Sequence, residues 1–113
     1  MKCAVIGSRS IVIDNIGEYI PPEADEIVSG GAVGVDSAAA EYAAAHGIKL
    51  SVFLPDYKKY GRAAPIVRNK TIVDYSDIVI ALWDGKSRGT SQVIEYCRHT
   101  GACVKVILLN SKE

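Results

Sequence analysis

Short apolar runs alternate along the chain with segments that are rich in alanine or repeat their apolar residues at helical spacing. The apolar runs predict five strands, at residues 3–6, 26–28, 48–54, 77–82 and 102–109. The fourth run contains Ile78-Val79-Ile80-Ala81-Leu82 with no polar interruption, which is typical of a strand buried on both faces. The pattern therefore indicates a sheet whose central strands lie between two layers.

Four helices are predicted between these strands, at residues 11–20, 35–46, 63–75 and 90–99. In the first, Val12 and Ile16 share one helical face with Tyr19 or Ile20, and Pro21-Pro22 stops the segment. In the second, small apolar residues recur at helical spacing from Val35 onward. Each connection between successive strands is thus expected to contain a helix.

Strict alternation of strands and helices predicts an α/β fold, a Rossmann-like domain of three layers with a five-stranded parallel sheet. The 113 residues are the length of one domain, so we expect residues 1–113 to form a single unit. Two strand orders fit, 3-2-1-4-5 and 2-1-3-4-5. We favour 3-2-1-4-5, because its switch point lies between strands one and four, which the most polar loops follow.

The charge balance argues against a large polyanionic partner. Lys and Arg total 13, Asp and Glu total 13, and the formal net charge is zero. Bulk electrostatic attraction to nucleic acid or to an anionic membrane is therefore not expected. No apolar run approaches the roughly 18 residues of a membrane span, and the run after Met1-Lys2 is too short for a signal-peptide core.

The three cysteines indicate a reducing compartment. Cys3, Cys97 and Cys103 are odd in number and fall in predicted core elements. They are interpreted as reduced, buried thiols of a cytoplasmic protein rather than as a disulfide framework or a metal site. His46 and His99 stand alone, so no metal ligand set is predicted.

Three glycine-containing loops are predicted to meet at the carboxyl edge of the sheet, where open parallel sheets bind ligands. They are residues 7–9, 29–34 and 85–90, and each contains a hydroxyl and leads into the next predicted helix. Free amides and the positive end of a helix dipole suit phosphate. The candidate ligand-binding residues are Gly7, Ser8, Arg9, Gly30, Gly31, Gly34, Asp36, Asn69, Lys86, Ser87, Arg88, Gly89 and Thr90.

Structural explanations compete with this interpretation. The glycines after the second strand are explained equally well by turn geometry, and residues 85–90 could be a solvated loop with Thr90 as helix cap. Neither loop has the spacing of the dinucleotide fingerprint or of a Walker P-loop. Asp36 could equally favour the helix dipole or contact a ligand hydroxyl.

Polar and aromatic side chains outside these loops have similar alternatives. Asn69 shares an inward stripe with Ile66 and Val73 and so needs polar partners, either in a neighbouring loop or on a ligand. The adjacent Arg68 is expected to face the surface or the rim. Three aromatic residues flank the proposed cleft and could stack on a base, although packing is the commoner role: Tyr57, Tyr60 and Trp83.

Taken together, these segments resemble the SLOG superfamily. The motifs are Gly7-Ser8-Arg9, the run 29–36 (Ser-Gly-Gly-Ala-Val-Gly-Val-Asp), Tyr60-Gly61-Arg62-Ala63-Ala64, Arg68-Asn69 and Ser87-Arg88-Gly89-Thr90. They look most like its small stand-alone bacterial branch of YspA/YpsA-type proteins, over about residues 3–106. The resemblance implies a Rossmann-like domain that binds a nucleotide or a nucleotide-derived, ADP-ribose-like ligand. It also implies that Gly7, Ser8, Arg9, Gly30, Gly31, Gly34, Gly89 and Thr90 form the pocket.

The chain departs from the phosphoribohydrolases of that superfamily. Their motif resembles Pro-Gly-Gly-x-Gly-Thr-x-x-Glu with a catalytic glutamate, but here the third residue after Thr90 is Val93. The nearest acid, Glu95, lies two residues further and about 200° around a helix. The three loops contain no histidine, and Asp36 and Asp84 are the carboxylates near them.

We therefore expect a module that binds or senses a small nucleotide ligand, rather than an enzyme. The alternative is a hydrolase that cleaves an N-glycosidic or phosphoester bond of a nucleotide. A nucleic-acid-binding protein is a weaker third interpretation, and no membrane partner is expected. The sequence leaves open a homo-oligomer and does not identify the base or the sugar.

Overall fold

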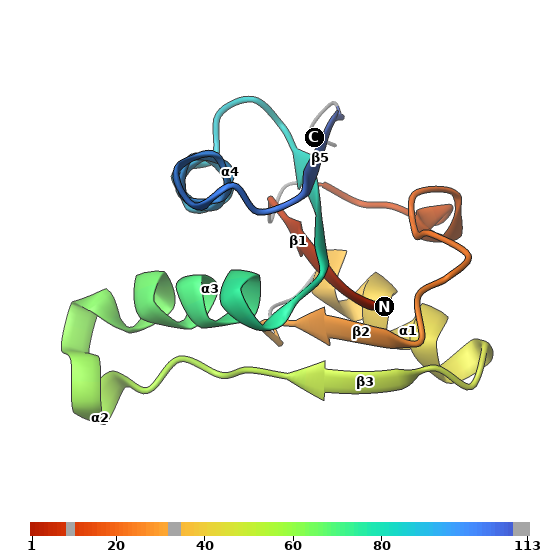
Figure 1. Ribbon diagram of the computed structural model, residues 1–113, viewed down its shortest axis with the longest axis horizontal. Coiled ribbons are helices and arrows are strands. Elements are labelled where there is room, and N and C mark those ends of the chain that lie inside the picture. Colours follow the sequence, from red (N-terminus) through yellow and green to blue (C-terminus); the bar gives the residue numbers. More distant parts are fainter. Residues whose placement is uncertain (9–10, 32–34, 110–113) are drawn as a thin grey trace.

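The computed structural model describes residues 1–8, 11–31 and 35–109, and its centre is a five-stranded parallel sheet (Figure 1). The strands are β1 (Lys2–Gly7), β2 (Glu26–Ser29), β3 (Lys49–Val52), β4 (Ile78–Trp83) and β5 (Val104–Leu108). The helices are α1 (Val35–Ala45), α2 (Tyr57–Tyr60), α3 (Ala64–Tyr75) and α4 (Arg88–Thr100), with 3-10 turns η1 (Ile16–Glu18) and η2 (Gly61–Ala63).

The strand order is β3-β2-β1-β4-β5, which confirms the predicted order. The central strand β1 pairs with β2 through Cys3 and Ile27, and with β4 through Val5 and Ile80. The chain therefore reverses its direction of winding between β1 and β4. Loops that leave these two strands lie side by side at the carboxyl edge, which is where such sheets bind ligands.

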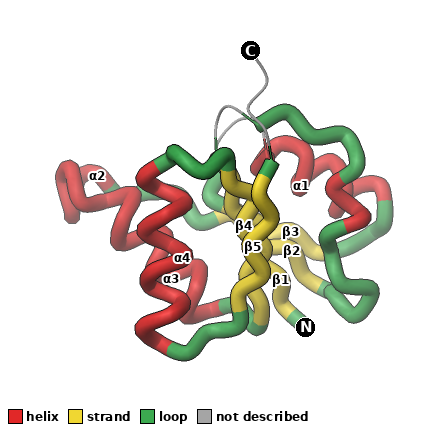
Figure 2. Tube along the Cα trace, turned by 90° about the horizontal axis from the view of Figure 1, so that it is seen from above, coloured by secondary structure: helices red, strands yellow, loops and turns green. Residues whose placement is uncertain are grey.

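Helices cover both faces of the sheet, as predicted. Figure 2 shows α1 on one side of the strands and α3 with α4 on the other. On the α1 side, Ala39 and Ala43 are fully buried against the sheet, so small side chains let this helix pack closely. On the opposite side, Ile72 of α3 and Val93 of α4 pack against the strands.

The first predicted helix is wrong, because residues 11–20 contain only the 3-10 turn η1. Val12, predicted to share a helical face with Ile16, is 69% exposed, while Ile11, Ile16 and Ile20 are buried. The run Ile-Val-Ile is β-branched, and Asp, Asn and Gly follow it, all of which are weaker helix formers than Ala or Leu. An irregular path buries three isoleucines without requiring helical spacing.

Two other boundaries differ from the sequence prediction. Residues 55–61, which lie between a predicted strand and a predicted helix, contain the short helix α2. Its first turn is capped by the Asp56 carboxylate, which accepts from the Lys59 amide at 3.1 Å. Helix α4 begins at Arg88 rather than at Thr90, with Ser87 as N-cap. As a result, Gly89 and Thr90 lie within the first turn of α4.

Two of the three cysteines are buried, as expected, and one is not. Cys3 and Cys97 are inaccessible, and burial raises the pKa of Cys3 to about 11 and raises that of Cys97. Cys103, which was also expected to be buried, is exposed because it precedes the edge strand β5. No helix in the described ranges is long and apolar enough to cross a membrane.

Candidate functional site

The loops after β1 and β4 are joined by Ser8. Its amide donates to the Leu82 carbonyl at 3.1 Å, and its hydroxyl oxygen accepts from the Asp84 amide at 3.3 Å. Ser8 is 2% exposed, so this hydroxyl organises the two loops from inside the protein. The switch point of the sheet is therefore a fixed junction between two of the three candidate loops.

The loop from Trp83 to Ser87 is ordered by its own polar groups. One Asp84 carboxylate oxygen accepts from the Lys86 and Ser87 amides, at 2.9 and 2.8 Å. Trp83 donates from its indole Nε1 to the Ser87 carbonyl at 3.0 Å. This hydrogen bond ties the indole ring to the N-cap residue of α4. The hydroxyls of Ser87 and Thr90 lie 3.5 Å apart. Lys86 and Arg88 are exposed on either side of this turn.

The first turn of α4 presents backbone amides at this edge. The helical hydrogen bonds begin with the Ser91 amide, which donates to the Ser87 carbonyl at 3.2 Å. Amides of a helix's first turn have no acceptor within the helix, and together with the helix dipole they favour an anion. The amides of Arg88, Gly89 and Thr90 occupy this position.

Gly89 has no structural explanation of its own. The structure describes the surroundings of nine glycines. Among these nine, Gly89 is the one that has no positive φ and also has open space within 4 Å of an added Cβ. Glycine in a helix is less favourable than alanine by up to about 1 kcal/mol. Neither the backbone conformation nor packing in the described part of the chain therefore requires glycine at this position.

Structural roles account for the other described glycines of the candidate site. A Cβ on Gly7 would lie 2.5 Å from Val35, so this glycine lets α1 pack against β1. A Cβ on Gly30 would lie 2.6 Å from the Arg68 guanidinium, and Gly31 has a φ of +77°. The Ser29 hydroxyl oxygen accepts from the Gly31 amide at 3.1 Å and holds this turn.

Three candidate residues lie wholly or partly outside the described part of the chain. Arg9 and Gly34 lie outside the described residues. Asp36 is in the first turn of α1, and its side chain also lies outside the described part.

Arg68 was expected at the surface or rim but is half-buried at the carboxyl ends of β2 and β3. Its Nη1 donates to the carbonyls of Gly30 at 2.8 Å and Phe53 at 3.4 Å, and its Nε donates to Asn69 Oδ1 at 2.7 Å. Helical periodicity predicted Asn69 as the inward residue and missed its neighbour. The long arginine side chain reaches back from the helix because two strand-end carbonyls require donors.

The Arg68 charge has only neutral partners in the described part of the chain. Two backbone carbonyls and one carboxamide accept its hydrogen bonds, and the ion pairs found there, Met1 with Asp25 and Lys49 with Glu26, do not include it. A partly desolvated cation without a carboxylate partner favours an anionic ligand nearby. The sequence signalled Arg68 only through its place in the Arg68-Asn69 motif.

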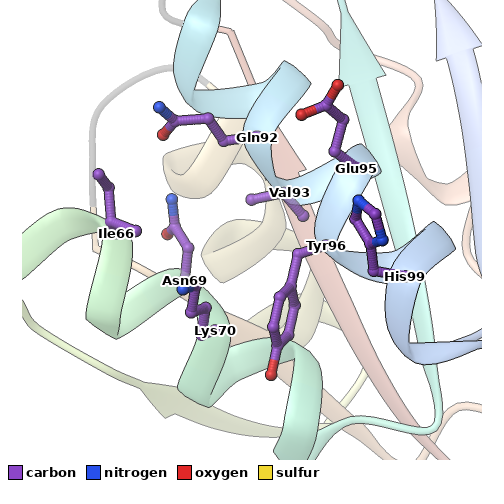
Figure 3. A pocket seen from close by; sticks show the side chains of 8 residues that line it. All are labelled: Ile66, Asn69, Lys70, Gln92, Val93, Glu95, Tyr96 and His99. Carbon is purple, nitrogen blue, oxygen red and sulfur yellow. The ribbon is translucent and has the colours of Figure 1, made fainter.

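A groove of about 300 Å³ runs between α3 and α4 (Figure 3). It is lined by Ile66, Asn69 and Lys70 of α3 and by Gln92, Val93, Glu95, Tyr96 and His99 of α4. Of the candidates predicted from sequence, Asn69 lines this groove. The other lining residues were missed, although the spacing 66, 69, 70 on one helix and 92, 93, 96 on the other is typical of two facing helix surfaces.

A second cavity, of about 310 Å³, lies between the end of β3, α2 and α3. Arg68 and Tyr60 line it, whereas Tyr57 is 61% exposed on α2. In the described ranges, no three His, Cys, Asp or Glu side chains gather where they could hold a metal ion.

Comparison with known proteins agrees with the resemblance drawn from the motifs. The family model of the YspA, cpYpsA-related SLOG family matches residues 11–60. No curated protein and no solved structure matches the chain significantly. The family match confirms the similarity to SLOG proteins over β2, the loop that follows it, α1, β3 and α2, and it ends before Arg68 and the α4 turn.

Proposed function

We propose that this protein binds a nucleotide or a nucleotide-derived, ADP-ribose-like ligand by its phosphate, at the carboxyl edge of the sheet. The observation that carries the proposal is Gly89, a first-turn helical glycine that neither its backbone nor its packing requires. The absence of a side chain lets a phosphate oxygen approach the amides of α4 directly.

Arg68 provides independent support. Its guanidinium lies at the ends of β2 and β3 with neutral hydrogen-bond partners, and its Nη1 contacts the carbonyl of Gly30 in the second candidate loop. Arg88 and Lys86 add exposed positive charge at the third loop. A phosphate between these groups would complete their charge balance.

A panel of phosphate-bearing ligands tests the proposal. Thermal unfolding is followed with AMP, GMP, NAD, ADP-ribose and ribose 5-phosphate, with adenosine as the control that lacks phosphate. A ligand at 100 times its Kd adds about 2.7 kcal/mol to the free energy of unfolding, or about 10 °C in Tm for a domain of this size. If no phosphate ligand shifts the Tm at millimolar concentration, the proposal is wrong.

One observation favours a second candidate function, hydrolysis of the N-glycosidic bond of a nucleotide. Glu95 lines the groove between α3 and α4 and supplies a carboxylate there, with His99 one turn further along α4. Val93, which stands at the position of the hydrolase glutamate, is buried and cannot transfer a proton. We place binding first, because the position that would carry the chemistry is aliphatic.

A further inference from the structure

The groove between α3 and α4 continues the surface on which Gly89 lies. Gln92 and Val93 follow Gly89 by three and four residues, so the three residues share one face of α4. Gln92 lies about 4.5 Å further along the helix axis than Gly89, at 1.5 Å per residue. A group attached to a phosphate at the helix start therefore reaches the groove within the length of one sugar.

The walls of this groove suit a flat ring. Ile66 supplies exposed aliphatic surface from α3, and the almost fully buried Val93 of α4 also lines the groove. The Tyr96 ring is fixed by its hydroxyl, which donates to Asp74 at 2.7 Å, and the Lys70 ammonium lies 5.6 Å from the ring centroid. The volume of about 300 Å³ is at the lower end of the range for small-molecule sites.

The polar groups of the groove are arranged to read the edge of a base. Figure 3 shows the carboxamides of Asn69 and Gln92 directed toward the same part of the groove from opposite helices. Asn69 Oδ1 accepts from Arg68, so its Nδ2 remains as the donor for a ring nitrogen or carbonyl oxygen. Glu95 offers an acceptor for an exocyclic amine, and Gln92 can both donate and accept.

We propose that the base of the bound nucleotide lies in this groove, and that Asn69, Gln92 and Glu95 select a purine with an exocyclic amine. The inference rests on the proposed phosphate site and adds the class of ligand to it. Asn69 also joins the two parts, because its carboxamide holds the Arg68 guanidinium that contacts Gly30. Uracil lacks the exocyclic amine that would donate a hydrogen bond to Glu95, and ribose 5-phosphate lacks a base altogether.

Calorimetric titration with AMP, GMP, UMP and ribose 5-phosphate tests the inference on the intact chain. We expect AMP or GMP to bind about tenfold or more tightly than UMP and ribose 5-phosphate, the factor that one or two hydrogen bonds supply. Gln92→Leu should remove most of that preference and leave the affinity for ribose 5-phosphate unchanged. Arg98→Leu, which puts the same leucine on an exposed α4 position outside the groove, should retain the preference.

The outcomes separate this inference from the proposed function. If all four ligands bind equally, or if Gln92→Leu keeps the purine preference, the base does not lie in the groove, although the phosphate site stands. If none of the four ligands binds, both proposals are wrong.

Discussion

The guanidinium of Arg68 in α3 donates a hydrogen bond of 2.8 Å to the carbonyl of Gly30, a residue 38 positions earlier in the chain. This contact fixes the glycine turn after β2 against the helix that follows β3. An added Cβ on Gly30 would lie 2.6 Å from Arg68 Nη1, so a side chain there would require the guanidinium to shift. The contact between Arg68 and Gly30 thus joins a candidate loop to a cation that the proposed ligand would need.

Replacing Arg68 is expected to reduce both stability and binding. Arg68→Met keeps the aliphatic stem but leaves the Gly30 carbonyl without its donor, which costs about 1–3 kcal/mol in the free energy of unfolding. Chemical denaturation measures that loss, and titration with AMP measures the loss of affinity. Arg62→Met, at an exposed arginine of η2, is the matched control and should change neither quantity. Unchanged AMP affinity in Arg68→Met would remove Arg68 from the site.

The stability of the fold is expected to depend on Glu26 at acid pH. This buried carboxylate accepts from Tyr75 at 2.6 Å and from Ser51 at 2.7 Å, and Lys49 lies 3.7 Å away. The Tyr75 hydrogen bond, followed by that of Ser51, lowers the pKa of Glu26. Its stabilisation is therefore present above the ordinary value of 4.5 and is lost as the pH falls through the lower folded value.

Glu26→Gln should reduce the fall in the free energy of unfolding between neutral and acid pH. The expected loss at pH 7 is about 1 kcal/mol, and the difference from the unmutated protein should shrink below pH 4. Denaturation across pH 3 to 7 measures this, with Glu41→Gln on the exposed face of α1 as control. Equal pH dependence of the two variants would show that Glu26 makes no special contribution.

Thiol labelling should separate the three cysteines. Cys103 is exposed, whereas Cys3 and Cys97 are fully buried, with pKa values raised by burial. A thiol reagent should therefore modify one equivalent in the native protein and three after denaturation, since a buried thiol is neither accessible nor ionised. Cys103→Ser should abolish the native equivalent, and fast labelling in that variant would contradict the described burial.

The protein is not expected to release free base from AMP, CMP or GMP. Glycosidic cleavage develops positive charge on the ribose, and a carboxylate is the usual group that stabilises it. Val93 supplies none at the position of the hydrolase glutamate. Chromatography of the reaction mixture detects free base, and turnover that disappears in Glu95→Gln would establish the hydrolase instead. Turnover that persists in Glu95→Gln would point to a different carboxylate.

The sequence was sufficient to predict the strand order of the sheet, but not the structure of every segment that connects two strands. Uninterrupted apolar runs and the polar loops after the first and fourth strands led to the observed order β3-β2-β1-β4-β5. The helix predicted over 11–20 failed because Ile11, Ile16 and Ile20 are buried from an irregular segment, and a spacing compatible with a helix does not require one. Tertiary burial outweighed local periodicity there.

The geometry of the candidate site was predictable where it follows from the order of the strands, and not where it depends on long side chains. The loops at the ends of β1 and β4 meet through Ser8 and Asp84, as the topology required. Arg68 was assigned to the surface or the rim, because helical periodicity predicts where a Cα lies and not where a guanidinium several bonds away lies. The groove between α3 and α4 depends on how the two helices pack against each other. This packing cannot be predicted from the sequence of either helix alone.

The most direct test of the phosphate site is the affinity of Gly89→Asp for the tightest phosphate ligand of the panel, measured by calorimetry. Open space surrounds Gly89, so the variant should fold with an unchanged circular dichroism spectrum. The added carboxylate would meet the phosphate at the start of α4, and we expect at least a tenfold loss, about 1.4 kcal/mol. Ala44→Asp, which adds the same charge to an exposed position of α1, should bind as the unmutated protein does. Full affinity in a folded Gly89→Asp variant would contradict the account and place the ligand elsewhere.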